Sequence, residues 1–122
     1  MKSYKDLEVY SLSLELFYKC HSISLKLPKH ELYELGSQLR RSADSVTTNI
    51  VEGYGRKRYK ADFIKFLTYS WASGLETVFH IEKIAKIYPE IIENKEEFIS
   101  KYNELNAKIY NFIKYVEENW KT

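Results

Sequence analysis

The sequence is poor in the residues that mark several common protein classes. It has one cysteine, Cys20, which excludes an internal disulfide and suits a reducing compartment such as the cytoplasm. No run approaches the roughly 20 apolar residues that a transmembrane helix needs. The charged first residues have no apolar segment directly behind them, so we expect neither a secretory signal nor a membrane partner. These absences favour a globular cytoplasmic protein, with Cys20 as a small buried side chain.

Motifs typical of enzymes and of metal or cofactor sites are also missing. Glu76 and His80 are four residues apart, whereas di-metal bundles use repeated Glu-x-x-His pairs with a spacing of three. The chain has no Gly-x-Ser-x-Gly, no Walker loop and no paired cysteines. The Gly-Tyr-Gly at 53–55 follows a predicted helix, whereas phosphate loops precede one. We therefore predict no enzymatic activity, no metal and no cofactor.

Apolar residues recur at three- and four-residue intervals over four long segments, as on one face of an α-helix. The predicted helices span residues 6–27, 31–54, 60–88 and 95–120. Pro28 and Pro89 end the first and third, because proline disfavours a helical conformation in the residue before it. Alternation typical of strands is absent. The sequence predicts one all-α domain over residues 1–122, an antiparallel up-down-up-down four-helix bundle.

Single residues predict details of these helices. We expect Asp6 to cap the first helix, and Gly53 and Gly55 to end the second. Ser70 and Gly74 lie on the apolar seam of the third. Glycine inside a helix costs about 1 kcal/mol relative to alanine, so close approach of a neighbouring helix is the expected compensation.

A stripe of small polar side chains lies beside the apolar face of the second helix. Its members are Gln38, Ser42, Ser45, Asn49 and Glu52. In one interpretation they let helices approach and form hydrogen bonds that fix the packing. In the other they line a groove or pore that contacts a ligand. We favour the structural interpretation, and expect Asn49 and Glu52 to bond with Ser73 or Glu76 on the third helix.

Charge is distributed unevenly, although the net charge is only +2. Between residues 37 and 65 there are seven basic and three acidic residues, and from residue 90 onward five basic and seven acidic ones. Cations that hold phosphates and aromatics that stack on bases are the elements of single-strand recognition. The candidate nucleic-acid-binding residues are Arg40, Arg41, Arg56, Lys57, Arg58 and Lys60, with Tyr54 and Tyr59 for stacking. The alternative is a cluster that aids solubility or pairs with acidic residues of a neighbouring subunit.

The chain carries more apolar surface than one small bundle can bury. The first helix is apolar over a wide arc, and the third has several large apolar residues off its main seam. These are Ile64, Trp71, Leu75 and Phe79. Because large exposed apolar patches mark interfaces, we predict a homo-oligomer.

Several short motifs also resemble those of a known family. They are Asp6-Leu7-Glu8-Val9-Tyr10, Leu27-Pro28, Gln38-Leu39-Arg40-Arg41-Ser42, Asn49-Ile50-Val51-Glu52-Gly53-Tyr54-Gly55-Arg56, Phe63-Ile64-Lys65-Phe66-Leu67, Ser73 and Glu76. The chain resembles the bacterial four-helix-bundle proteins encoded in intervening sequences of 23S rRNA genes, the 23S rRNA-associated proteins. These are similar to the accessory variability determinant proteins of diversity-generating retroelements. Asp44, Val51 and Trp71-Ala72 depart from the family pattern. The resemblance implies a pentameric ring and an association with RNA.

Together these observations predict a non-enzymatic accessory protein that binds nucleic acid, RNA rather than DNA, as a ring-shaped homo-oligomer with a basic face. The alternative is a protein-interaction scaffold that binds a partner such as a polymerase or reverse transcriptase, with the basic residues serving assembly. A small-molecule binder is disfavoured, because polar groups converge nowhere except along the polar stripe.

Overall fold

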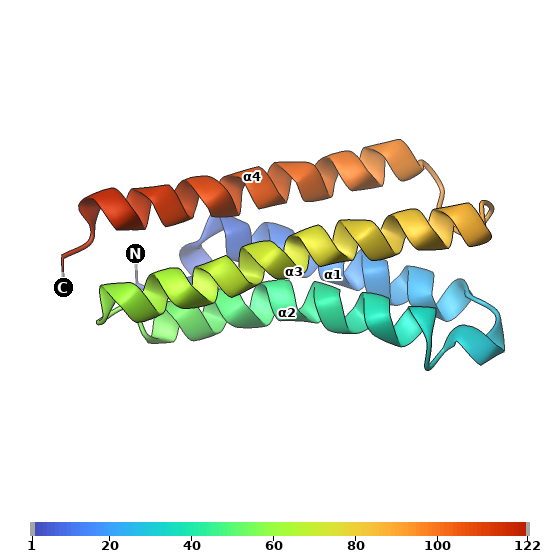
Figure 1. The fold of residues 1–122 in the computed structure, drawn as a ribbon, viewed down its shortest axis with the longest axis horizontal. Coiled ribbons are helices and arrows are strands. Elements are labelled where there is room, and N and C mark those ends of the chain that lie inside the picture. The colour runs from blue at the N-terminus through green and yellow to red at the C-terminus, as the bar shows by residue number, and fades with distance from the viewer. Residues whose placement is uncertain (1, 122) are drawn as a thin grey trace.

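Four long α-helices account for most of the chain. The computed structural model describes residues 2–121. In it the helices are α1 (Glu8–Lys26), α2 (Leu35–Gly55), α3 (Lys60–Ile87) and α4 (Lys95–Asn119), with two short 3-10 helices, η1 (Tyr4–Asp6) and η2 (Lys29–Glu31). Consecutive helices run in alternating directions (Figure 1). Residues 2–121 contain no strand, so the predicted all-α, four-helix fold is confirmed. No helix in this range is long and apolar enough to cross a membrane.

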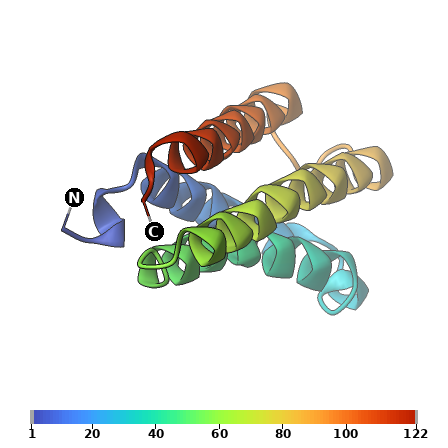
Figure 2. The same cartoon turned by 60° about the vertical axis from the view of Figure 1, so that its left-hand side comes forward.

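The helices contact one another unequally. α2 and α3 share the most extensive interface, followed by α1 with α2 and α3 with α4, whereas α1 and α4 touch over a much smaller area. The alternating directions bring the N-terminal segment, the α2–α3 link and the C-terminal segment to one end of the molecule (Figures 1 and 2). The other two links lie at the opposite end, so the first end is built from three separate parts of the chain and the second from two.

The core is formed by apolar side chains from all four helices. Its largest fully buried members are Tyr102, Phe63, Leu16, Leu39, Ile50, Leu67, Ile81, Ile84, Leu105 and Ile109. Each buried leucine, isoleucine or phenylalanine stabilises the fold by about 1.5–3 kcal/mol relative to leaving it exposed. The main seam expected on the third helix is largely buried, although Val78 and Ala85 on it are only half-buried.

The N-terminal boundaries differ from those expected. Asp6 does not cap α1. Its Oδ2 accepts hydrogen bonds from the backbone N–H groups of Lys2 (2.9 Å) and Ser3 (3.1 Å), forming a capping box around η1. The short carboxylate closes the turn that precedes it, so Leu7 takes the N-cap position and α1 begins at Glu8. The second long helix begins at Leu35 rather than at residue 31, because η2 ends at Glu31 and residues 32–34 form turns.

The two glycines near residue 54 do not end α2 in the way expected. Gly53 lies inside the helix and Gly55 is its last residue, and no glycine in residues 2–121 has a positive φ. The next residue, Arg56, caps the helix, and its N–H donates to the carbonyls of Glu52 (3.2 Å) and Gly53 (3.0 Å). A Cβ on Gly53 would lie 3.2 Å from the Cβ of Phe66. Gly53 therefore permits close approach of α3.

Candidate functional site

The polar stripe of α2 contacts α3 through its first three members. The hydroxyls of Ser45 and Ser73 lie 2.8 Å apart, and those of Ser42 and Thr77 lie 3.0 Å apart. At the start of the stripe, the Oε1 of Gln38 accepts a hydrogen bond from Lys83 Nζ at 3.2 Å. These contacts agree with the structural interpretation for this part of the stripe.

The bonds expected of Asn49 and Glu52 are wrong. The Nδ2 of Asn49 lies 2.9 Å from both the carbonyl and the hydroxyl of Ser45, one turn earlier on its own helix. Short polar side chains commonly bond to their own backbone in this way. Glu52 accepts from Arg56 Nε at 2.8 Å, since a cation four residues later on a helix is the nearer partner. Glu76, the other expected partner, lies 3.0 Å from His80 Nε2.

The candidate metal ligands and the single cysteine are separated in the structure. Within residues 2–121 no group of three or more His, Cys, Asp or Glu side chains is placed to hold a metal ion. Cys20 is fully buried, with its Sγ 3.3 Å from the Tyr102 hydroxyl. Burial raises the pKa of its thiol to about 12, although the Tyr102 hydrogen bond lowers it. At neutral pH the thiol is protonated, and the thiolate needed for a nucleophile is absent.

The candidate basic residues fall into two groups at opposite ends of α2. Sixteen residues separate Arg40 from Arg56, which corresponds to about 24 Å along a helix. Arg40 is half-buried, and its guanidinium donates to the Ser24 hydroxyl (3.0 Å) and to the Leu32 carbonyl (2.8 Å). It fastens the α1–α2 connection to α2. Arg41, the next residue along the helix, is exposed.

In the second group, at the α2–α3 link, Arg56 forms ion pairs with two neighbouring carboxylates. Its Nε donates to Glu52, its Nη1 lies 3.7 Å from Asp62 Oδ2, and its guanidinium lies 4.7 Å from the ring centre of Phe66. The hydrogen bond that Arg56 donates to Glu52 raises the pKa of Arg56, with Asp62 adding to the effect. Arg56 therefore joins the two helices across the link.

Lys57, Lys60 and Tyr54 also have contacts within the chain. The ammonium of Lys57 lies 3.7 Å from the ring centre of Tyr54, and the Lys57 carbonyl accepts from Trp120 Nε1 at 2.8 Å. Lys60 Nζ donates to the Glu117 carbonyl at 2.7 Å, near the end of α4. The Tyr54 ring is half-buried and also contacts Tyr4. One face of this ring is thus covered by a cation, which leaves Tyr54 poorly placed to stack on a base.

Arg58 and Tyr59 present the most accessible cation and aromatic ring of the link. Tyr59 is 58% exposed, and the guanidinium of Arg58 lies 5.8 Å from its ring centre. Arg58 is exposed and makes no ion pair within residues 2–121. A cation beside an exposed ring can bind a phosphate and a base of the same nucleotide.

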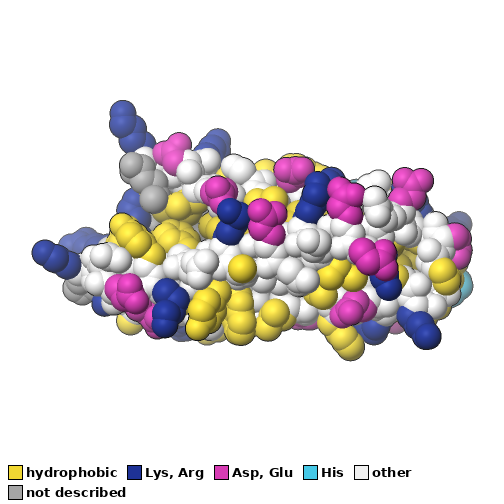
Figure 3. All heavy atoms as spheres, turned by 90° about the horizontal axis from the view of Figure 1, so that it is seen from above, with side chains coloured by type: hydrophobic (Ala, Val, Ile, Leu, Met, Phe, Trp, Pro, Cys, Tyr) yellow, Lys and Arg dark blue, Asp and Glu magenta, His cyan; other side chains and the backbone are white. Residues whose placement is uncertain are grey.

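Three further cations at this end were not among the predicted residues. Lys2, Lys5 and Lys121 are exposed and belong to the terminal segments, which lie beside the α2–α3 link. Figure 3 shows basic side chains gathered at this end, the left of the view. We define the basic end as Lys2, Lys5, Arg56, Lys57, Arg58, Lys60 and Lys121. It combines three parts of the chain that no single sequence window contains.

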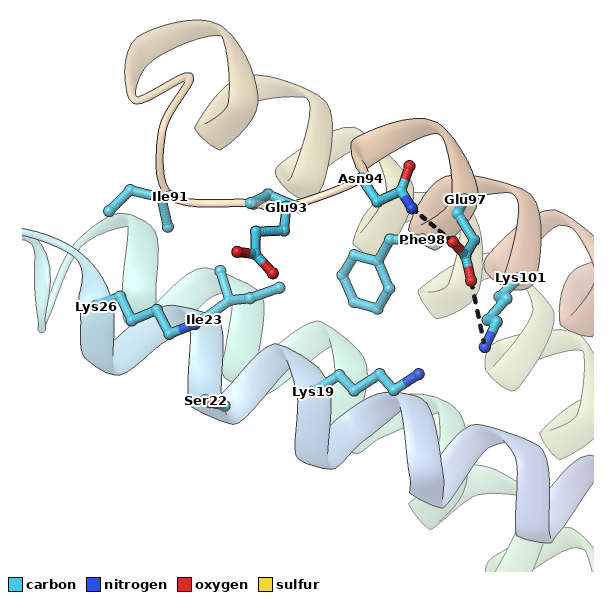
Figure 4. A pocket seen from close by; sticks show the side chains of 11 residues that line it. Lys19, Ser22, Ile23, Lys26, Ile91, Glu93, Asn94, Glu97, Phe98 and Lys101 are labelled. Carbon is cyan, nitrogen blue, oxygen red and sulfur yellow. Dashed lines mark hydrogen bonds and ion pairs between the residues drawn. The ribbon is translucent and has the colours of Figure 1, made fainter.

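A pocket of about 290 Å³ opens at the other end of the molecule, between α1 and the start of α4 (Figure 4). Ile23 and Phe98 form part of its apolar wall, and lysines and glutamates surround it. The charges there are partly paired: Glu97 accepts from Asn94 Nδ2 at 2.7 Å and lies 3.9 Å from Lys101 Nζ. Mixed, exposed charges of this kind select no particular ligand.

Comparisons with known proteins agree with the four-helix architecture. The sequence profile described as "23S rRNA-intervening sequence protein" matches residues 5–111. A crystal structure of a protein of unknown function from the S23 ribosomal protein family of Bacteroides thetaiotaomicron is similar to this chain, with a TM-score of 0.74 and 26% identity over 87% of this chain and 95% of that one. A search of curated proteins gave no match. Since the matched region covers most of the sequence, the chain belongs to the 23S rRNA-intervening sequence protein family.

Proposed function

We propose that this protein is a non-enzymatic accessory protein that binds nucleic acid through its basic end, RNA in preference to DNA, as a ring-shaped homo-oligomer. The observation that carries the proposal is the convergence of the α2–α3 link with both terminal segments, which places seven cations and the exposed ring of Tyr59 together. The resemblance that implies a pentamer supports the ring. Each subunit of a ring would present one basic end, and repetition strengthens weak phosphate contacts.

The cations divide by role in this proposal. Arg56 and Lys60 hold the link in shape through Glu52 and the Glu117 carbonyl, so they act on the ligand mainly by positioning. Arg58, Lys2, Lys5 and Lys121 contact phosphate. Arg41, exposed but distant, provides a second contact for a long ligand.

RNA is the favoured ligand for two reasons. An exposed ring beside a cation suits unstacked bases, which RNA offers in loops, bulges and single strands. The family description refers to an rRNA gene, which supports the same preference.

The test is a binding titration of single-stranded RNA, structured RNA and duplex DNA over a series of salt concentrations. Arg58→Glu should weaken RNA binding and make the slope of log K against log salt shallower, because fewer counterions are released. Tyr59→Ala should weaken binding to single strands without changing that slope. Lys29→Glu, the same charge reversal at the opposite end, is the control. Equal losses in Arg58→Glu and Lys29→Glu would show that total charge, and not the basic end, governs binding.

A protein-interaction scaffold is the second candidate, and the exposed apolar side chains favour it. Leu75 and Phe79 on α3 are 48% and 56% exposed, at positions where a helix facing solvent would usually carry polar residues. If the wild-type protein bound no nucleic acid near physiological salt, the scaffold would replace the first proposal. The search for a partner protein, such as a polymerase, would then begin at these side chains.

A further inference from the structure

Two helices carry outward faces with the same spacing and without formal charge. We define the α1 face as Tyr10, Leu14, Phe17, Tyr18, His21 and Leu25, and the α3 face as Ile64, Thr68, Trp71, Ala72, Leu75 and Phe79. Both sets follow the pattern i, i+4, i+7, i+8, i+11, i+15. Each runs about 22 Å along its helix at 1.5 Å per residue. Neither contains Lys, Arg, Asp or Glu, which is unusual for the solvent side of a helix.

The α1 face forms one wall of a groove. Four of the groove's lining residues, Tyr10, Leu14, Phe17 and Tyr18, belong to this face, and Thr48 and Val51 of α2 lie opposite. The groove has a volume of about 430 Å³. Its only charged lining residues are Asp44 and Glu52, so it is apolar with an acidic side. Asp44 is exposed and makes no ion pair within residues 2–121.

The α3 face carries large exposed apolar side chains. Leu75 and Phe79 are exposed on it, and Trp71 is half-buried against Tyr110 of α4 with ring centres 6.1 Å apart. Beyond Phe79 the helix carries Lys83 and Lys86, with Glu82 between them. Large apolar side chains, with two lysines at the end of the face, complement an apolar groove with an acidic side.

The two faces lie on different sides of the molecule. α1 and α3 make no helix–helix interface with each other and occupy diagonal positions, α3 at the front and α1 at the back of Figure 1. The α1 face opens beside α2, whereas the α3 face opens beside α4. A single copy therefore cannot bring its own two faces together.

We propose that the α3 face of one copy docks in the α1–α2 groove of the next copy, so that the contact is head-to-tail. This inference rests on the homo-oligomer of the proposed function and names the surfaces that build it. The partner is a second copy, because equal length, equal spacing and opposite charge are found on two faces of the same chain. A contact between unlike faces repeats from copy to copy and closes into a ring when the rotation permits.

Cysteine cross-linking tests the pairing. Tyr18→Cys and Phe79→Cys each place one thiol on one face, and the buried Cys20 provides little background. Co-expressed with different tags and treated with a short bis-maleimide, the two variants should link to each other, and neither should link to itself. A chain with both substitutions should give a ladder of covalent oligomers. Tyr33→Cys, whose parent side chain is 83% exposed outside both faces, should link to neither variant.

Self-linking of Tyr18→Cys or of Phe79→Cys would show a contact between like faces and would overturn the inference. So would the absence of links in a preparation whose mass shows that it is assembled. In that case the homo-oligomer stands and only the choice of surfaces is wrong. A wild-type chain that stays monomeric would remove both the ring and this interface, while the RNA titration would still decide the role of the basic end.

Charged substitutions provide an independent measurement. Leu75→Asp should shift the mass measured by light scattering to smaller species, because a carboxylate would be desolvated at the contact. Tyr115→Asp changes an α4 side chain that is 53% exposed and lies outside both faces, so the mass should not change. Thermal unfolding of each variant separates loss of assembly from loss of fold. If Leu75→Asp folds and keeps the wild-type mass, the α3 face is not the contact.

Discussion

The α2–α3 interface and the attachment of α4 show two ways of joining helices. Between α2 and α3 the contact is close and polar at its margin, with Gly53 against Phe66 and paired hydroxyls from Ser45 and Ser73. α4 is instead held through larger side chains, such as Phe112 against Phe63, and it contacts α1 over only a small area. Small side chains bring two helices together over their whole length, whereas large ones support a helix at separate points.

This difference agrees with the position of one pocket. The pocket of Figure 4 lies between α1 and α4, where the two helices touch over only a small area. α2 and α3 also carry the link that contributes most of the basic end. The closely packed pair thus holds the candidate binding residues, and the following variants measure how unequal the two regions are.

The largest effect is expected from removing a side chain of the α2 core. Ile50 is fully buried, so Ile50→Ala should lower the free energy of unfolding by about 2–5 kcal/mol. Ile23→Ala is the matched change at the pocket between α1 and α4, where the side chain already borders open space. Its loss should be smaller, and denaturant unfolding of both variants measures the difference. Equal losses would mean that the two regions are packed equally well.

Gly74 and Asn106 form the one close approach between α3 and α4 that depends on a glycine. A Cβ on Gly74 would lie 1.9 Å from Asn106 Oδ1, and the Asn106 amide has no hydrogen-bond partner among the described residues. Gly74→Ala should therefore lower the free energy of unfolding by about 1–3 kcal/mol. In an Asn106→Ala background the same change should be neutral or stabilising, because alanine favours helix by about 1 kcal/mol.

A double-mutant cycle of these two positions gives the coupling free energy directly. The sign of this coupling free energy matters more than its size, because the Asn106 amide must move to admit a Cβ at position 74. If Gly74→Ala costs the same with and without the asparagine side chain, the glycine is needed for some reason other than this contact.

Much of the fold could be predicted from the sequence, because the buried positions repeat with helical period. The close packing expected at Gly74 is confirmed by Asn106. Boundaries were harder: the segment before Leu35 has apolar residues at helical spacing, yet it forms η2 and turns. The predicted partners of Asn49 and Glu52 were wrong, because groups one turn away on the same helix compete for these hydrogen bonds. Helical periodicity alone does not show which partner is preferred.

The candidate site could be predicted only in part. Arg58 and Tyr59 are adjacent in sequence, so the local pattern was sufficient to select them. Arg40 was selected for its charge, but its hydrogen bonds to Ser24 and Leu32 depend on a loop whose path no pattern revealed. The contribution of Lys2 and Lys121 depends on the alternating directions of the helices, a property of the whole chain.

Alkaline pH should weaken the attachment of α4 to α1. Burial raises the pKa of the Cys20 thiol from 9.0 to about 12, and burial also raises the pKa of Tyr102. Between about pH 9 and 12 the unfolded chain releases the thiol proton while the folded chain retains it. The folded state therefore binds more protons, and its stability falls as pH rises.

For Cys20 the expected loss is about 1–2 kcal/mol by pH 10.5, with at most about 1.4 kcal/mol per pH unit. Unfolding of wild type and Cys20→Ala from pH 8 to 10.5 measures the difference in slope. The variant should have a shallower slope, and Tyr102→Phe should reduce what remains. Parallel curves for wild type and Cys20→Ala would contradict the buried position of the thiol.

The smallest effect is expected from a single hydrogen bond between α2 and α3. Ser70 is fully buried, and its hydroxyl donates to the Val46 carbonyl at 2.7 Å. Ser70→Ala should lower the free energy of unfolding by about 0.5–1.5 kcal/mol, since a hydrogen bond between two buried groups is lost. Ser100→Ala, at an exposed position on α4, should change it by a few tenths of that amount. A loss for Ser70→Ala well above this range would mean that the hydroxyl also fixes the distance between the helices. The close packing of α2 against α3 would then depend on one small polar side chain as much as on the area in contact.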